Sequence, residues 1–408
     1  MKALLLSVGN EVLSGKTINT NASFLAIELE KLGIEVVKVV TIGDEKNILK
    51  HEVEVFLESD IDLIVTTGGL GPTHDDFTKE VLFETAGVEL VSRKEPLDLL
   101  NRYFQGDFAK CNLKQTYYPK DAYLLPNEKG TAMGAVYKDN EKNKIFTILV
   151  GPPFEMKPMV NNYLIPYLKN LINKPKLINE YIVMGVGESQ VEDILKNYYP
   201  KYPNVEIAPY CSIGKVRYQL TSYVEHKSEF ENASLEFQKI LDKYIVSDKN
   251  EEIEDLVYQE LKRLNYRISF AESCTGGMLA SKLINVDGAS SVLDESLVTY
   301  SNQSKIELLK VNEETINTFD VVSEEVAKEM AIGVRNFAKT QVGVSSTGYA
   351  GPLGGTQQIP VGTVCFAISV NDSLFTKSVC FKTSRNLVRE KATMLIYYYL
   401  YTVLKEIK

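Results

Sequence analysis

The first 90 residues alternate short apolar runs with longer segments of helical periodicity, and this alternation restricts the fold more than any other feature. Apolar runs typical of buried parallel strands are Lys2–Val8, Glu35–Thr41 and Ile61–Thr67. Helices are expected at Thr20–Leu32, with Thr20-Asn21 at its cap, at Glu45–Ser59 and at Asp75–Thr85. Repeated strand–helix units with right-handed crossovers predict an α/β fold built on a doubly wound parallel sheet.

The length of 408 residues is enough for two or three domains. Polar segments at 173–176 and 247–250 read as a linker and a hinge. We therefore expect an N-terminal domain over 1–172, a connecting module over 173–248 and a C-terminal domain over 249–408.

The two later domains are predicted from shorter patterns. The connecting module shows a β-α-β-β-α order typical of a small α+β fold, with elements at Tyr181–Gly185, Ser189–Tyr198, Val205–Tyr210, Val216–Val224 and Glu229–Ile245. The C-terminal domain is expected to be a three-layer α/β/α domain, with helices over Glu251–Leu264 and from Leu387, and with strands at Arg267–Ala271, Val342–Ser346, Thr363–Val370 and Leu374–Phe381.

Composition excludes several classes of protein. The five cysteines are scattered without a CxxC pair, which argues against a disulfide framework and a zinc site and favours a cytoplasmic location. No run approaches the ~18 apolar residues of a membrane span, so no membrane association is expected. A net charge of −9 argues against a chain-wide nucleic-acid surface.

A glycine-rich turn follows the third predicted strand of the N-terminal domain. Gly68, Gly69 and Gly71 allow backbone amides to approach a phosphate at the carboxyl edge of the sheet. Asp75 and Asp76 follow, and carboxylates beside a phosphate repel it unless a divalent cation lies between them. The pattern predicts metal-assisted phosphate chemistry; the alternative is a tight turn in which one aspartate caps the next helix.

Glu11 ends the first strand and would emerge at the same edge of the sheet. It is a candidate metal ligand together with Asp75 and Asp76. A contact to a ribose, or a charge at the end of a helix, are the alternatives.

The three histidines, at positions 51, 74 and 226, all precede the C-terminal domain. Any hydrolytic serine there must use a base other than imidazole. Ser273 lies on a strand-to-helix turn, where its hydroxyl is exposed at the sheet edge and the amides of Cys274–Gly277 offer an oxyanion hole. Tyr300 and Lys305 are the candidate bases, because a desolvated lysine can accept the serine proton.

Two alternatives stay open at Ser273. The serine is otherwise a helix cap and Lys305 a solvated helix residue. Cys274 competes for the nucleophile role, because thiolates form readily at helix N-termini.

These motifs resemble the CinA family (competence/damage-inducible protein CinA). In the N-terminal domain the similarity rests on 9–15, Thr20-Asn21, the run 68–76 and the run 126–132. It implies the molybdopterin-binding fold of the MoaB/MogA proteins and, as in some members, an ADP-ribose pyrophosphatase that depends on a divalent metal (Mg²⁺, Mn²⁺ or Co²⁺). The nucleotide site implied contains Glu11, Asn21, Gly68, Gly69, Gly71, Asp75, Asp76 and Thr131. Met133 replaces the usual proline after Gly-Thr-Ala.

The C-terminal domain is similar to the PncC domain of CinA proteins, a nicotinamide mononucleotide (NMN) deamidase. The similarity rests on 271–277, 298–302 with Lys305, 322–324, 347–355 and 360–364. It implies that Ser273, Tyr300 and Lys305 are catalytic and that no cofactor is needed. The implied NMN-binding residues are Cys274, Thr275, Gly276, Gly277, Thr347, Gly351, Gly354 and Arg389, with Arg385 as a second candidate for the C-terminal arginine.

The resemblance also implies a KH-like module between the two domains. Gly185-Val186-Gly187-Glu188 is not the GXXG loop with which KH domains bind nucleic acid. We interpret the module as a spacer or dimerisation element, and expect a homodimer that acts on NMN and ADP-ribose and not on nucleic acid. The competing interpretations are an adaptor whose sites bind nucleotides without turnover and a molybdopterin-handling enzyme.

Overall fold

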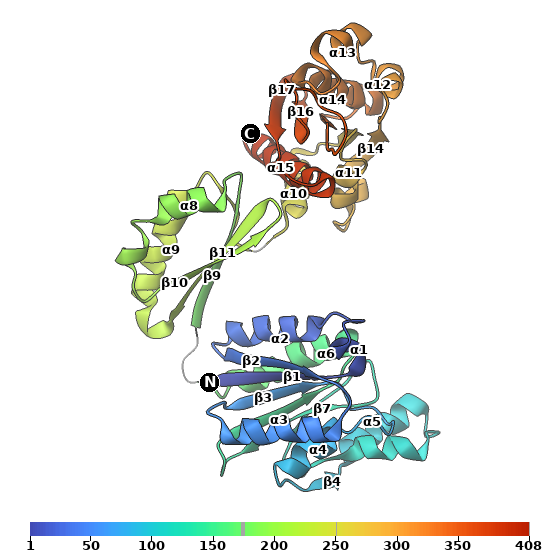
Figure 1. Ribbon diagram of the computed structural model, residues 1–408. Helices are drawn as coiled ribbons and strands as arrows, with labels where there is room; N and C mark the ends of the chain where they lie inside the picture. The colour runs from blue at the N-terminus through green and yellow to red at the C-terminus, as the bar shows by residue number, and fades with distance from the viewer. Residues whose placement is uncertain (173–175, 250, 408) are drawn as a thin grey trace. The chain divides into compact units, whose positions relative to one another are not determined.

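The structure is a computed structural model, and it describes residues 1–172, 176–249 and 251–407. Contacts sort these residues into two units, Met1–Leu177 with Tyr223–Glu225, and Ile178–Ser222 with His226–Lys408 (Figure 1). Most of the expected linker at 173–176, and Asn250 of the expected hinge, lie outside the described residues. Residues 178–222 and 226–248 of the expected module share a unit with the C-terminal domain, and the division into three domains stays a prediction.

The first unit is built on a six-stranded sheet in the order β2-β1-β3-β8-β7-β6. Its strands are β1 (Lys2–Val8), β2 (Glu35–Ile42), β3 (Leu63–Thr67), β6 (Tyr123–Leu125), β7 (Gly134–Asp139) and β8 (Lys144–Leu149). The strands β2, β1, β3 and β8 run parallel, and β7 and β6 continue the sheet antiparallel. Every residue of β3 and β8 is buried, as expected of strands covered on both faces.

Helices cover both faces of this sheet. Along the chain they are α1 (Asn10–Leu13), α2 (Thr20–Lys31), α3 (Lys46–Glu58), α4 (Thr78–Thr85), α5 (Lys94–Phe104), α6 (Pro153–Met159) and α7 (Ile165–Lys169), with a π-helical turn, η2 (Val160–Leu164), before α7. Helices α2 and α6 lie on one face, and α3 and α4 on the other (Figure 1). The expected doubly wound sheet is confirmed.

One predicted helix cap and one predicted helix start are wrong. Helix α2 is capped by Asn19, whose side chain accepts from the Ala22 amide, and not by Thr20-Asn21. Helix α4 begins at Thr78 because the residues before it form an irregular turn, so Asp75 and Asp76 precede the helix. Between α4 and β6, β4 (Leu90–Ser92), α5, the 3-10 turn η1 (Lys110–Thr116) and β5 (Tyr117–Pro119) form an excursion from the sheet.

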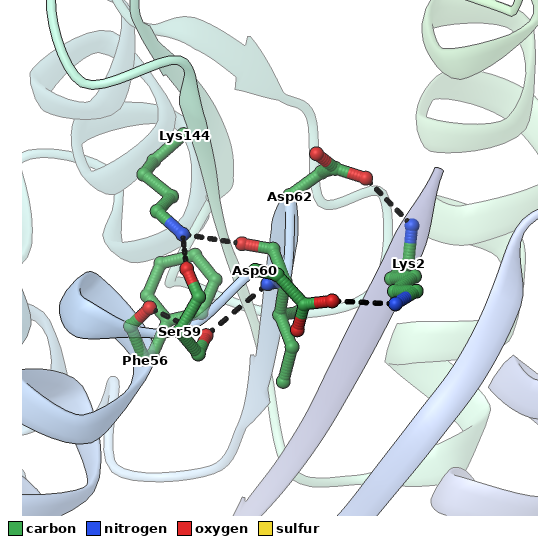
Figure 2. A network of polar contacts seen from close by, with 7 residues as sticks. Lys2, Phe56, Ser59, Asp60, Asp62 and Lys144 are labelled. Carbon is green, nitrogen blue, oxygen red and sulfur yellow. Dashed lines mark hydrogen bonds and ion pairs between the residues drawn. The ribbon is translucent and has the colours of Figure 1, made fainter.

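A polar network ties together the amino ends of the parallel strands (Figure 2). The backbone amide of Lys2 donates to Asp62 at 2.7 Å, and its ammonium group pairs with Asp60. Lys144, at the start of β8, donates to the carbonyls of Ser59 and Ile61, each at 2.7 Å. This network lies at the edge of the sheet opposite to the carboxyl ends of the strands, so it fixes the strands without occupying the edge where ligands bind.

In the second unit, the β-α-β-β-α order of the module is confirmed and is followed by one more strand. The elements are β9 (Lys176–Met184), α8 (Glu188–Leu195), β10 (Glu206–Ser212), β11 (Lys215–Tyr223), α9 (Lys227–Leu241) and β12 (Ile245–Ser247), with short 3-10 turns at Tyr199–Lys201 and Val224–His226. The sheet has the order β10-β11-β9-β12.

The C-terminal domain is the expected three-layer α/β/α structure. Its sheet has the order β14-β13-β15-β16-β17, made from β13 (Ile268–Glu272), β14 (Leu293–Val298), β15 (Val342–Gly348), β16 (Thr363–Val370) and β17 (Ser373–Cys380). Three strands, β14, β13 and β15, are parallel, and β16 and β17 are antiparallel. The sequence did not indicate β14, whose residues are mostly half-buried or exposed at the edge of the sheet.

Two groups of helices pack on opposite faces of this sheet (Figure 1). One group contains α10 (Ile253–Leu264), α11 (Met278–Leu283) and α15 (Arg385–Lys405), and the other contains α12 (Asn302–Leu309), α13 (Glu313–Phe319) and α14 (Glu324–Ala338). Most of the Tyr-rich half of α15 is core, since Ile396, Tyr397 and Leu400 are fully buried. None of the described helices is long and apolar enough to cross a membrane.

Candidate active sites

A cavity of about 520 Å³ opens at the carboxyl ends of β1 and β3 in the first unit. All the residues predicted for the N-terminal site line it: Glu11, Asn21, Gly68, Gly69, Gly71, Asp75, Asp76 and Thr131. They come together because parallel strands end at one edge of the sheet, where the chain must turn. Gly68 requires glycine: its φ is +96°, and a Cβ there would overlap the carbonyl oxygen of Val8.

The two aspartates converge on one hydroxyl group. Thr73 Oγ1 contacts Asp75 Oδ1 and lies 2.5 Å from Asp76 Oδ2, which also accepts from the Thr73 amide at 3.0 Å. The Thr73 hydroxyl holds the pKa of Asp75 below its usual value. The start of α4 receives no side-chain cap, so neither aspartate has the capping role of the alternative interpretation.

This pair of carboxylates has the donor chemistry of a divalent cation site. One hydroxyl proton cannot satisfy two carboxylates, and oxygen ligands suit Mg²⁺ and Mn²⁺. Within the three described ranges, no cluster of three or more His, Cys, Asp or Glu side chains is arranged to hold a metal ion. A cation held by Asp75 and Asp76 would therefore complete its coordination with water and substrate phosphate, as Mg²⁺ commonly does.

The other predicted residues lie around these aspartates. Glu11 lines the cavity with its carboxylate folded over Gly9. Asn21 donates to the carbonyl of Gly151 at 2.7 Å, and its buried Oδ1 has no hydrogen-bond partner among the described residues. An orphaned acceptor at a cavity wall suits a ligand donor such as a hydroxyl or amine group.

Sequence reasoning missed Gln115, which organises this cavity. Its buried amide donates at 3.3 Å to the carbonyl of Leu70 and to the hydroxyl of Thr131. It thereby joins the glycine-rich turn to the segment that carries Thr131. Asp44, Lys129 and Glu155 also line the cavity. The charged residues of the 126–132 motif could have indicated Lys129. No sequence pattern marks Gln115, because it lies in the irregular excursion between α4 and β6.

In the second unit, Ser273 and Lys305 form a buried pair. Ser273 follows β13, and its amide donates to Ser346 of the adjacent strand β15 at 3.0 Å. Lys305 is 1% exposed and donates to Ser273 Oγ at 3.3 Å and to the carbonyls of Thr299 and Tyr300 at 2.9 and 3.4 Å. Burial lowers the pKa of Lys305 to about 8. The alternative of a helix cap and a solvated lysine does not describe this pair.

Cys274 differs from Ser273 in reactivity. Its side chain is buried, and burial raises the pKa of the thiol to about 12. A buried thiol that stays protonated is a poor nucleophile, so the adjacent serine is the better candidate.

The Tyr300 phenol contacts an arginine and not the lysine. Its side chain is 62% exposed, and its hydroxyl accepts from Arg385 at 3.1 Å. Arg385 also donates to the carbonyl of Gly351 at 2.7 Å, which ties together Tyr300 and the glycine-rich loop. Tyr300 therefore contacts Lys305 through its backbone carbonyl, while its phenol lies at the rim with Arg385.

The remaining predicted residues lie on β15, the glycine-rich loop, the serine turn and α15. Thr347 is buried at the end of β15 and donates to the carbonyl of Val321. Gly354 packs against the Tyr349 ring at a φ of +90°. Thr275 shares a 2.6 Å hydrogen bond with Ser346, and Arg389 donates to the carbonyls of Cys274 and Thr275, each at 3.0 Å.

The oxyanion site differs from expectation at Gly277. The Gly277 amide donates to the carboxylate of Glu272 at 2.9 Å, so it is already engaged. The amides available to an oxyanion are then those of Cys274, Thr275 and Gly276. Sequence reasoning missed Glu272, although a glutamate directly before a serine and a glycine-rich turn was visible.

Comparison with known proteins matches both units. The family model "Probable molybdopterin binding domain" covers residues 4–170, and "CinA C-terminal domain" covers 250–404. A CinA-like protein from Kosmotoga olearia is 40% identical, over 97% of this chain and 97% of that protein. A Clostridium botulinum protein named as competence-damage inducible is 39% identical, over 95% of this chain and 96% of that protein. The crystal structure of a competence or damage-inducible protein from Enterobacter asburiae is 34% identical and covers 38% of this chain and 99% of that chain, with a TM-score of 0.37.

Proposed function

Because the chain belongs to the CinA family, we propose that its C-terminal domain hydrolyses NMN to nicotinate mononucleotide and ammonia, and that its N-terminal domain is a metal-dependent ADP-ribose pyrophosphatase. Both reactions would serve pyridine nucleotide recycling in the cytoplasm. The observation that carries the deamidase proposal is the buried Ser273–Lys305 pair, with its 3.3 Å contact.

The lysine supports a general-base role through its surroundings. Two carbonyl oxygens, of Thr299 and Tyr300, accept N–H bonds from Lys305. When the amine loses its third proton, the lone pair faces Ser273 Oγ and can accept the serine proton. A pKa of about 8 makes this neutral form accessible near physiological pH.

The reaction then proceeds through an acyl-enzyme. Ser273 Oγ bonds to the carboxamide carbon of NMN as its proton passes to Lys305, and the amides of Cys274, Thr275 and Gly276 hold the oxyanion. The C–N bond breaks as Lys305 returns the proton to the departing ammonia. Water, deprotonated by Lys305, attacks the acyl carbon and releases nicotinate mononucleotide and Ser273.

Substrate phosphate is assigned to the exposed rim. Arg385 is exposed, and among the described residues its hydrogen bonds go to an exposed phenol and a loop carbonyl, so it can turn toward a phosphate with little loss. The Gly351–Gly355 loop beside it supplies backbone amides. Arg389, by contrast, already donates hydrogen bonds to two carbonyls of the serine turn.

The N-terminal proposal rests on the cavity. Glycine amides, the Asp75–Asp76 pair and the unpartnered Asn21 oxygen line one space and match phosphate, cation and hydroxyl groups respectively. A divalent cation bound by Asp75 and Asp76 would neutralise phosphate charge. The residues of the chain would bind and orient the diphosphate against it.

A two-substrate assay tests both proposals. Purified protein is incubated with NMN, and separately with ADP-ribose plus Mg²⁺, Mn²⁺ or Co²⁺, while ammonia and AMP are measured. We expect both products, and we expect Ser273→Ala and Lys305→Ala each to abolish ammonia release with unchanged thermal unfolding. Wild-type turnover in either variant would refute the Ser–Lys assignment. Binding of both nucleotides without products would instead favour the adaptor.

A further inference from the structure

The serine turn of the C-terminal domain is held from both sides by groups that do not face the reacting atoms. Glu272, the last residue of β13, is fully buried. One of its oxygens, Oε2, accepts from the amides of Gly277 and Leu279 at 2.9 and 3.1 Å, and Oε1 accepts from the amide of Ala280 at 3.0 Å. The carboxylate therefore ties the end of the strand to the first turn of α11, with the serine turn between them.

Arg389 holds the opposite side of the same turn. From α15 it donates through Nε to the carbonyl of Cys274 and through a terminal nitrogen to the carbonyl of Thr275. A guanidinium fork that binds two successive carbonyls fixes the orientation of the peptide planes between them. The same nitrogen would lie 3.3 Å from a Cβ at Gly276, so the turn packs directly against the arginine.

Fixing these carbonyls also fixes the amides that remain. The carbonyl of Cys274 and the amide of Thr275 belong to one planar peptide, as do the carbonyl of Thr275 and the amide of Gly276. A carbonyl held by Arg389 thus directs the amide of the same peptide to the opposite side. The amides of Gly277, Leu279 and Ala280 are donated to Glu272. Of the three amides left to an oxyanion, two, those of Thr275 and Gly276, therefore belong to these held peptides.

We propose that Glu272 and Arg389 are positioning residues that act as one clamp on the serine turn: Glu272 holds its amide end and Arg389 holds its carbonyls, so that the amides of Thr275 and Gly276 are preorganised donors to the oxyanion. This inference rests on the proposed deamidase for its kinetic consequence, but the clamp itself is a property of the fold. It removes Arg389 from the substrate-binding residues expected from the sequence.

The test uses the full chain and three variants. Glu272→Gln keeps the size of the side chain but loses an acceptor oxygen, and Arg389→Lys keeps the charge but not the fork. Glu254→Gln is the matched control, because Glu254 is a buried glutamate of α10 that pairs at 3.0 Å with Lys282, near the far end of α11, and accepts no hydrogen bond from the described residues of the serine turn. For each variant we measure kcat and KM for NMN, thermal unfolding, and hydrogen exchange of the peptide that contains Gly277, Leu279 and Ala280.

We expect kcat to fall about 100-fold in Glu272→Gln and in Arg389→Lys, the order of loss caused by a displacement of about 1 Å at a reacting group, with KM nearly unchanged. Exchange at the start of α11 should accelerate in Glu272→Gln alone. The control should change neither kcat nor this exchange, even where its unfolding temperature falls.

The outcomes separate the clamp from the proposed function. Unchanged exchange in Glu272→Gln, or faster exchange with full kcat, would overturn the clamp. A raised KM with full kcat in Arg389→Lys would show that Arg389 binds substrate phosphate. Should wild-type protein release no ammonia from NMN, the deamidase proposal fails, while accelerated exchange in Glu272→Gln would still establish the contact. Should Glu272→Gln fail to fold, Arg389→Lys carries the kinetic test.

Discussion

At the scale of single residues, the reactivity of the C-terminal domain depends on which groups are kept from water. Ser273 and Lys305 are both buried, and the cost of burying a charge lowers the pKa of the lysine to about 8. Burial has the opposite effect on the neighbouring thiol, because there the charged form is the deprotonated one, and the pKa of Cys274 rises to about 12. One environment thus favours a neutral base and disfavours a thiolate.

The pH dependence of the proposed deamidase follows from the lysine. The base acts as the neutral amine, which is the minor form below the pKa, so kcat/KM should increase tenfold per pH unit in acid and level off above about pH 8. Lys305→Arg, which stays charged, should be inactive throughout. Ammonia release measured from pH 5.5 to 10 checks both. A profile that levels off below pH 7 would contradict lysine as the base.

At the scale of elements, positions at strand ends were predictable and side-chain directions were not. Apolar runs place Gly68 and Ser273 at the carboxyl ends of buried strands, where the structure has them. The lack of histidine in the C-terminal domain restricted the base to a few residues that include Lys305. By contrast, the contact of the Tyr300 phenol with Arg385 joins residues 85 positions apart, and no local pattern records it.

The start of α4 and the strand β14 were mispredicted for a related reason. The predicted helix began at Asp75, and acidic residues do suit the first turn of a helix. In the structure Asp75 and Asp76 bond instead to Thr73, and this side-chain competition delays α4 to Thr78. Strand β14 was missed because an edge strand that is only partly buried lacks a continuous apolar run.

The turn after β3 makes an element-scale prediction. Gly68→Ala and Gly87→Ala both place alanine at positive φ, +96° and +73°, with a common cost of about 1 kcal/mol. Only at Gly68 does the new Cβ meet backbone, the carbonyl of Val8, whereas nothing lies within 4 Å at Gly87. Gly68→Ala should therefore lower the unfolding temperature more than Gly87→Ala does, and it should abolish AMP release from ADP-ribose. If the two substitutions lowered the unfolding temperature equally, the steric overlap with the carbonyl of Val8 would be refuted.

At the scale of the whole molecule, the two candidate sites lie in separate units and contain different reactive groups. The Asp75–Asp76 pair belongs to Met1–Leu177, and the Ser273–Lys305 pair to the unit that contains His226–Lys408. Each site is completed by residues of its own unit, as Gln115 and Thr131 are in the first and Arg389 and Ser346 in the second. The two activities should therefore be separable within one intact chain.

Reciprocal inactivation of the full-length protein measures this separation. Asp75→Asn combined with Asp76→Asn should abolish AMP release from ADP-ribose. Ammonia release from NMN should stay within twofold of wild type, which corresponds to a change of at most about 0.4 kcal/mol in activation free energy. Ser273→Ala should have the reverse effect. EDTA should stop the first reaction and spare the second. Loss of ammonia release in the double aspartate variant, or on EDTA treatment, would show that the two sites are coupled.

The order of strands in the first sheet has a consequence for synthesis on the ribosome. Strand β1 is translated first but lies between β2 and β3, and the parallel set is complete only when β8 (Lys144–Leu149) is added. At about 5 to 20 residues per second, β8 follows β1 by about 7 to 30 seconds. During that interval β3 has no partner on its β8 side, so the sheet keeps an open apolar edge while the rest of the domain is still being synthesised.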